Sequence, residues 1–404
     1  MNRMRFALVL LLGSAWLGVA GPRGLAAQLA PLGPEGEIPT DVFPRKPFLA
    51  VQPGGDSMVG FDDFSPSYSS VFYRFLAAGS MPSWEDGWFS IESPDSSPET
   101  VAVTATPRGF DLLWRITDSD YKTTAFYRGH FDLKGEPDGE PVRVGRAGTD
   151  WVWQVRGNGF VAGWALPKAH GIAARRLTST GQTTGPELRL NSRPVDSPNP
   201  VVLAVADGGF LAVWLGTARA PGAPQVLRAR RFSPAGKPLG PDFDVNTVPL
   251  DGSLDLQDPS AFLVSAAPGG GFAVAWWRGG KNCLRFFDAA GKALGPEAPA
   301  AIDDGAFLAS MAFDDVGNLL LLWVLDQGRD DHETDLKIRL LDPHGTPLGP
   351  PESVISEASD IFRAPWDGSV AWAGDSWIVA WVAAGLPAGD FDGIFVRRFA
   401  GPQQ

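Results

Sequence analysis

The chain has 404 residues, of which 44% are hydrophobic and 20% charged, so a packed core is feasible and a largely disordered chain is excluded. The formal net charge of −12 argues against nucleic acid and anionic membranes as partners. Gly (48) and Pro (36) are abundant, which favours short elements joined by many turns. Cys283 is the only cysteine, so an internal disulfide is excluded.

The chain begins with a pattern typical of a secretory signal peptide. Arg3 and Arg5 precede an uncharged apolar run of 15 residues, and small residues follow it. We therefore expect residues 1–27 to be removed on export, with cleavage after Ala20 or Ala27. The alternative is an uncleaved anchor helix, for which the run is short. We expect the mature chain to be secreted, periplasmic or on the cell surface, with no insertion into a membrane.

One phrase recurs at steps of roughly 50 residues: Gly and Phe, then alternating apolar residues that end in Trp. Runs this short with a glycine turn before them predict strands and not helices. The Trp that ends each run is predicted to be buried between neighbouring repeats, since a large flat side chain fills a wedge well. These residues are Trp114, Trp164, Trp214, Trp276, Trp323 and Trp381, with Phe61 in a degraded first copy.

Two further phrases follow the first, the earlier one in all seven repeats and the later one in four of them. The earlier phrase is an apolar run that contains Arg and ends before a glycine turn, as in 226–232 before Gly236. The later phrase is Pro-Leu-Gly-Pro, as at 238–241, and it introduces another short extended run. Together with an apolar run ahead of the Trp phrase, each repeat holds four short strands. Four antiparallel strands per repeat predict the blades of a β-propeller.

The two ends of the chain predict how this ring closes. The last repeat stops after its third strand, at 399–402, and its fourth phrase is missing. A copy of that phrase stands instead near the start of the mature chain, at 31–34. We therefore expect a segment within residues 30–42 to pair antiparallel with residues 394–398, because this would complete the last blade and remove an exposed edge.

The fold class is thus all-β, a seven-bladed β-propeller of four-stranded antiparallel blades, in one domain over residues 28–404. The combined pattern resembles a family of bacterial exported repeat propellers with Gly-Gly-Phe…Trp, Arg-x-Phe and Pro-Leu-Gly phrases. The resemblance implies the architecture and leaves the activity open. The approximate blades are 46–95, 96–147, 148–195, 196–256, 257–302, 303–358, and 359–404 with 30–42.

Two groups of residues are candidates for a site. Loops between blades reach the channel mouth in such propellers, and carboxylates beside aromatic rings suit a sugar or peptide groove. This group is Asp255, Asp258, Asp303, Asp304, Asp360 and Trp366. The second group lies in one loop of the sixth repeat, where dense oxygen ligands suit Ca²⁺, the one cofactor that the sequence suggests. This group is Asp330, Asp331, Glu333 and Asp335, for which the alternative is a solvated hairpin tip.

The repeated residues are those that build the blades, and the sequence contains no known catalytic motif. We therefore favour an exported binding or scaffold module, acting as a monomer on an unidentified protein or glycan, over an enzyme. The alternative is a glycan-active hydrolase or lyase that uses paired carboxylates at the channel mouth. Propellers serve both purposes, so the fold alone does not decide between these functions.

Overall fold

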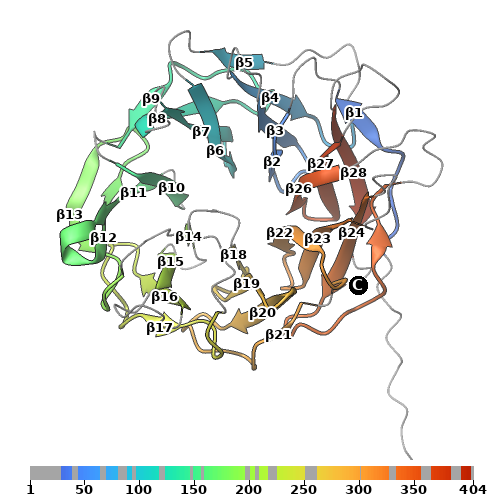
Figure 1. Ribbon diagram of the computed structural model, residues 1–404. Helices are drawn as coiled ribbons and strands as arrows, with labels where there is room; N and C mark the ends of the chain where they lie inside the picture. Colours follow the sequence, from blue (N-terminus) through green and yellow to red (C-terminus); the bar gives the residue numbers. More distant parts are fainter. Residues whose placement is uncertain are drawn as a thin grey trace, which may run out of the picture.

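Seven four-stranded antiparallel sheets stand around one axis and form a β-propeller (Figure 1). The computed structural model describes residues 29–38, 44–63, 70–80, 89–92, 97–117, 123–145, 149–155, 159–195, 201–204, 209–216, 225–250, 262–300, 302–326, 334–355, 365–383 and 393–401. The predicted signal peptide, residues 1–27, lies outside these ranges. Within them, no helix is long and apolar enough to cross a membrane.

Each sheet is a meander whose first strand lies nearest the axis. Blade 1 consists of β2 (Phe48–Val51), β3 (Ser57–Asp62), β4 (Ser70–Leu76) and β5 (Phe89–Glu92). Blade 2 consists of β6 (Ser97–Thr106), β7 (Gly109–Thr117), β8 (Thr123–Phe131) and β9 (Val142–Val144). Blade 3 consists of β10 (Trp151–Val155), β11 (Gly159–Leu166), β12 (Gly171–Leu177) and β13 (Thr183–Arg189). The 3₁₀ helix η1 (Pro167–Ala169) joins β11 to β12.

The remaining four blades repeat this plan. Blades 4 to 7 are β14 (Val201–Ala204), β15 (Phe210–Gly216), β16 (Val226–Phe232), β17 (Phe243–Asp244); β18 (Phe262–Ala266), β19 (Phe272–Arg278), β20 (Lys281–Phe287), β21 (Ala298–Pro299); β22 (Phe307–Phe313), β23 (Leu319–Asp326), β24 (Thr334–Leu341), β25 (Glu352–Ser353); and β26 (Pro365–Trp372), β27 (Ser376–Ala383), β28 (Gly393–Ala400), with β1 (Gly36–Ile38).

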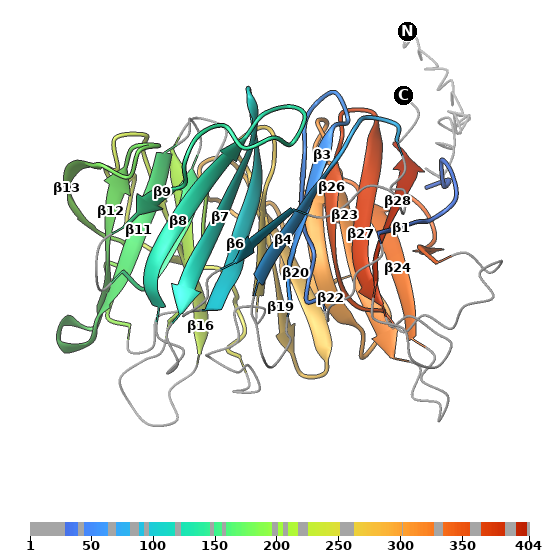
Figure 2. The same cartoon turned by 90° about the horizontal axis from the view of Figure 1, so that it is seen from above.

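The ring has two faces, which Figure 2 shows edge-on. We call upper the face that carries the connections between second and third strands and between successive blades; in the view of Figure 2 this face lies at the bottom. The lower face carries the tight turns between first and second strands and between third and fourth strands. A glycine with positive φ makes these lower turns, for example Gly236 (81°) and Gly291 (83°). Asp288 caps one of them, because its Oδ1 accepts from the N–H groups of Ala290 and Lys292.

The hydrophobic core lies between the blades, in seven clusters that each join two neighbouring sheets. Trp214 packs in one of them with Phe210 and Phe232 of its own blade and Val161 and Ile172 of blade 3. All six predicted tryptophans are buried, at 0 to 8% exposure, as the repeat pattern predicts. The repeated Trp is therefore a structural residue that fills the space between blades.

The repeated Arg also holds neighbouring blades together. Arg285 in the third strand of blade 5 donates from Nε to Gly295 O of its own Ala-Leu-Gly segment, which stands where other blades have Pro-Leu-Gly, at 3.2 Å. It donates from Nη1 to Val245 O of blade 4, at 2.7 Å, and its guanidinium lies over the Phe287 ring. Six blades carry Arg at this position: Arg74, Arg175, Arg230, Arg285, Arg339 and Arg397.

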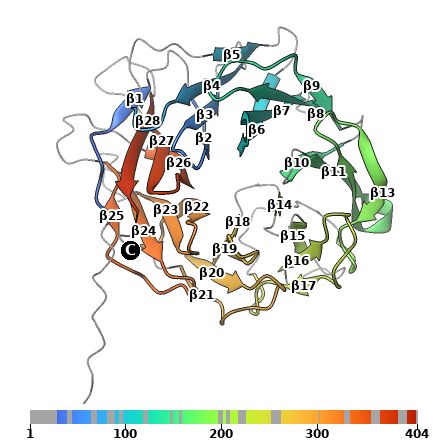
Figure 3. The same cartoon turned by 180° about the vertical axis from the view of Figure 1, so that it is seen from behind.

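The N-terminal segment completes the last blade, as predicted. Strand β1 pairs antiparallel with β28, with Glu37 opposite Phe395 (Figure 3). Pro31 forms a bridge with Phe399, and Leu32 N donates to Arg398 O at 2.9 Å. The outer edge of β28 is therefore paired, and the ring is closed by hydrogen bonds between the two ends of the chain.

Candidate functional site

The structure describes the side chains of three of the predicted site residues, and two of these carboxylates contact the same lysine. The Lys337 ammonium is 3.3 Å from Asp303 Oδ2 and 3.7 Å from Asp335 Oδ2, although the sequence assigns these carboxylates to different sites. Asp303 also accepts from the indole N–H of Trp323 at 3.0 Å. Asp303 thus fixes the Trp of blade 6, and Lys337 compensates both carboxylates.

The predicted calcium loop shows only its last member. Asp335 accepts from Ser353 Oγ at 2.9 Å and lies beside the Lys337 ammonium. A bound metal ion would therefore compete with Lys337 for this carboxylate. Asp330, Asp331 and Glu333 lie outside the described residues. Across the ranges given above, no three His, Cys, Asp or Glu side chains come together in a way that could hold a metal ion. The calcium site stays a prediction.

The other predicted ligand-binding residues form no site together among the described residues. Asp304 forms an exposed ion pair with Lys281 at 3.3 Å, an interaction that solvent weakens strongly. Asp255, Asp258 and Asp360 lie outside the described residues. Trp366 belongs to the innermost strand of blade 7, and its side chain lies outside the described part.

A cluster of charged residues that the sequence analysis missed lies at the upper end of the axis. Lys46 precedes the innermost strand of blade 1, and its Nζ donates to Ala309 O of blade 6 at 2.8 Å. The same ammonium is 3.4 Å from Asp367 Oδ1 of blade 7. Lys46 therefore joins three blades beside the axis. The residue before it, Arg45, donates its backbone N–H to Asp62 O at 2.9 Å, which brings the end of β3 beside Lys46. We call Lys46, Asp62, Glu99, Arg115 and Asp367 the axial cluster.

Asp62 holds the most unusual carboxyl group of this cluster. It ends β3, and its Oδ1 accepts from Thr100 N of blade 2 at 2.7 Å. The ladder of β6 shifts register at Thr100, and such a bulge turns a backbone N–H away from its own sheet. Burial among protein atoms raises the pKa of Asp62 from 3.8 to about 7, against the lowering effect of Thr100.

The neighbouring carboxylate has a different environment. Glu99 Oε2 accepts from Arg115 Nε at 2.9 Å and from Arg115 Nη2 at 2.5 Å. The side chains of Glu99 and Arg115 are 25% and 43% exposed, so a ligand on the upper face can reach both. Glu99 also contributes to the raised pKa of Asp62, because two negative charges so close repel each other.

The sequence marks Asp62 of this cluster only by a difference between repeats, since no known motif contains it. Asp62 follows Phe61, the last aromatic of the first Trp phrase. The corresponding residue is Arg115 in blade 2 and the apolar Leu215 in blade 4. An alignment of the seven repeats finds this carboxylate in place of an apolar or basic residue, whereas a search for known motifs does not.

Two other features lie outside the axial cluster. In blade 2 the fully buried Asp111 carboxylate contacts Arg128 Nη2 at 2.5 Å and His130 Nδ1 at 2.7 Å, which neutralises it within the blade. On the lower face, a pocket of about 330 Å³ lies between blades 5 and 6, against Phe286 and Phe313. Its lining is mainly apolar, which suits the binding of an apolar group better than catalysis.

Comparisons with known proteins identify the fold. No family model and no curated protein matches the sequence. The polysaccharide lyase Uly1 is 8% identical with a TM-score of 0.55, over 92% of this chain and 99% of that one. The β-propeller domain of the Trilobed protease from Pyrococcus furiosus is also 8% identical, with a TM-score of 0.53 over 89% and 94%. At such low identity these likenesses show the fold alone: the chain is a seven-bladed β-propeller.

Proposed function

We propose that the protein is an exported binding propeller that takes a glycan chain at the axial cluster. The observation that carries this proposal is the pair formed by Asp62, held by Thr100 N, and Glu99, held by Arg115. A carboxyl group with a pKa of about 7 can donate or accept a hydrogen bond near neutral pH. Sugar hydroxyls do both as well, so donors and accepting oxygens on one face suit a polyhydroxylated ligand.

Binding to an array of neutral and uronate-containing glycans tests this proposal. For a glycan that binds, Asp62→Ala should weaken the affinity by about tenfold or more, as expected for the loss of a poorly solvated hydrogen-bonding partner. Asp304→Ala is the matched control, because it removes an upper-face carboxylate from an exposed ion pair outside the cluster. Equal affinity of the Asp62→Ala variant, or binding to peptides alone, would contradict the glycan proposal.

A second candidate function is the cleavage of glycans. It is favoured by the same two carboxyl groups, since one carboxyl with a pKa near neutrality beside an ion-paired carboxylate suits acid–base catalysis. In a hydrolysis, Asp62 would donate its proton to the leaving oxygen while Glu99 accepts one from the attacking water. One propeller of similar fold is a polysaccharide lyase, so both reactions belong in the assay.

The enzymatic alternative is tested by incubating the protein with a polysaccharide panel. New reducing ends report either reaction, and ultraviolet absorbance of an unsaturated product reports a lyase. Asp62→Asn and Glu99→Gln should each abolish product formation while the ring stays folded. Substrate that remains intact while the same polysaccharide binds would leave the binding function and exclude catalysis.

A further inference from the structure

The charge of the chain is distributed very unevenly around the ring. Residues 151–250, which contain the strands β10 to β17 of blades 3 and 4, carry 11 Lys and Arg against 5 Asp and Glu. The rest of the chain carries 23 Lys and Arg against 41 Asp and Glu. This quarter of the sequence is therefore positive, at +6, in a protein whose net charge is −12. Such asymmetry points to an anionic partner on one side of the molecule.

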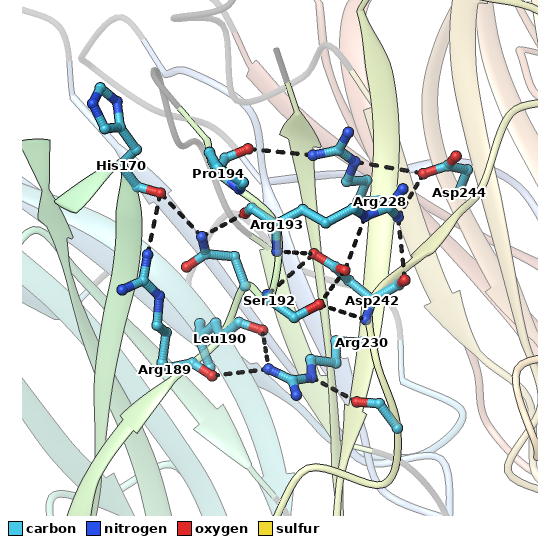
Figure 4. Close-up of polar contacts among 12 residues, drawn as sticks. His170, Arg189, Leu190, Ser192, Arg193, Pro194, Arg228, Arg230, Asp242 and Asp244 are labelled. Atoms are coloured by element: carbon cyan, nitrogen blue, oxygen red, sulfur yellow. Dashed lines mark hydrogen bonds and ion pairs between the residues drawn. The ribbon is translucent and has the colours of Figure 1, made fainter. Parts of the chain in front are cut away.

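Much of this positive charge meets along the contact between blades 3 and 4 (Figure 4). Arg189 and Arg193 come from the end of blade 3, and Arg228 and Arg230 come from β16 of blade 4. Arg176 of β12 lies beside the lower turn of blade 4, with its Cδ 3.0 Å from where a Cβ on Gly236 would stand. We call these five arginines, with Asp242 and Asp244, the blade 3–4 seam.

Two of these arginines are neutralised by carboxylates. Arg193 donates to Asp242 Oδ1 at 3.0 Å and to Asp244 Oδ1 at 2.7 Å, while Arg228 Nε is 3.5 Å from Asp244. Ser192 also donates to Asp242 through its hydroxyl and its backbone N–H. Burial alone would raise the pKa of Asp242, but these hydrogen bonds and the Arg193 charge outweigh it and lower the pKa.

Arg189 and Arg230 are held differently, by carbonyl oxygens. Arg189 Nη2 donates to Ala169 O at 2.8 Å, beside the 3₁₀ helix. Arg230 donates to Gly240 O at 2.8 Å and to the carbonyl oxygens of Arg189 and Leu190 at 3.3 Å each. A carbonyl group fixes a guanidinium without cancelling its charge, so Arg189 and Arg230 are ordered positive groups. Asp242 lies close enough to Arg230 to act on its charge, but it forms its direct ion pair with Arg193. Arg189 is exposed and Arg230 is partly exposed.

We propose that the blade 3–4 seam binds the carboxylate or sulfate groups of an anionic polysaccharide. Its arginines lie on or beside the third and fourth strands β12, β13 and β16, from the end of β13 to the lower turn at Gly236, so they form a strip and not a single point. A linear polymer with regularly spaced charges fits a strip. The planar fork of guanidinium matches carboxylate and sulfate oxygens, and it loses little freedom when it is already fixed.

The acidic remainder of the chain does not prevent this binding. At physiological ionic strength, charges further away than about 8 Å are largely screened, so the local seam decides. This surface is separate from the axial cluster, which lies on blades 1, 2 and 7. The inference therefore stands or falls independently of the function proposed for the axial cluster.

Binding to polygalacturonate and to dextran sulfate, with uncharged dextran as the control polymer, tests the inference. The mature protein should bind both anionic polymers and not dextran, and 300 mM NaCl should weaken the binding relative to 50 mM. Arg189→Gln and Arg230→Gln should each weaken it by about tenfold. Asp304→Ala should leave it unchanged, because Asp304 lies in an exposed ion pair outside both the seam and the axial cluster.

Arg285→Gln is the matched control for Arg230→Gln. Arg285 makes the same contacts one blade further on, to the glycine carbonyl of a Leu-Gly, to the preceding blade and over a Phe ring. Both variants should lose similar thermal stability, but Arg285→Gln should keep its affinity for the polymers. Equal weakening by both variants, equal affinity for dextran and for the anionic polymers, full affinity in Arg189→Gln, or no binding to either anionic polymer would overturn the inference.

Discussion

Arg397 Nε donates to the carbonyl oxygen of Gly33 at 3.4 Å, although 364 positions separate the two residues. The same contact occurs inside three other blades, in the pairs Arg230–Gly240, Arg285–Gly295 and Arg339–Gly349. The N-terminal Pro-Leu-Gly therefore serves the last blade as the internal turns serve the others. The contact also explains why Arg and Pro-Leu-Gly recur together in the sequence.

Deleting residues 28–42 should lower the melting temperature and promote aggregation, because it removes β1 and exposes the edge of β28. The segment also contributes Leu29 and Ile38, both buried in clusters of the last blade. Thermal melting and light scattering measure the effect, with a deletion of residues 402–404 as the control. An unchanged melting temperature would mean that the ring does not depend on this closure.

Trp214→Ala should lower the free energy of unfolding by roughly 3–5 kcal/mol, as expected when a large buried side chain is truncated. Trp214 is fully buried between blades 3 and 4. Denaturant unfolding measures the change, and Leu239→Ala, at a side chain that is 51% exposed, should change it by less than about 0.5 kcal/mol. Similar losses in the two variants would refute the role assigned to the repeated Trp.

Asp62→Asn should change how stability depends on pH. The raised pKa, about 7 in the folded protein against 3.8, means that the unfolded chain loses this proton first as the pH rises. The stability contributed by Asp62 is therefore complete below pH 3.8, declines up to about pH 7 and is constant above it. Denaturant unfolding between pH 4 and 8 should show this decline in the wild-type protein and not in Asp62→Asn. Asp304→Asn should retain the wild-type slope.

Asp242→Asn should act with the opposite sign. Its pKa is lowered in the folded protein, so the stability it contributes is complete above the ordinary value of 3.8 and is lost as the pH falls through the folded pKa. At pH 7 the variant should lose roughly 1–3 kcal/mol, because Arg193 and Ser192 lose a charged acceptor. The difference between wild type and variant should shrink in acid. A constant difference down to pH 2 would contradict the ion pair.

The strands and the ring closure could be predicted because their signals are local and repeated. The phrase at 209–214 predicts β15, and the duplicated Pro-Leu-Gly at 31–33 predicts the pairing of β1 with β28. A glycine turn and a two-residue alternation specify a strand with little help from the rest of the chain. Because the pattern occurs seven times, the strands of a weakly matching repeat can be predicted from the clearer repeats.

The axial cluster could not be predicted in the same way, because it depends on which residues of different blades meet. Asp62 and Thr100 are 38 positions apart, and only the register of two sheets brings them together. A search for carboxylates in loops likewise does not predict that Lys337 lies between Asp303 and Asp335. Loops far apart in sequence acquire their charge partners only in three dimensions.

The composite last blade has a consequence for how such a ring can evolve. The genetic unit of the repeat runs from a fourth strand to the next third strand, whereas the structural blade runs from first to fourth. Duplication or loss of one genetic unit in the middle of the gene leaves both chain ends, and so the pairing of Gly36–Ile38 with β28, untouched. The number of blades can therefore change in a single genetic step without reinvention of the closure.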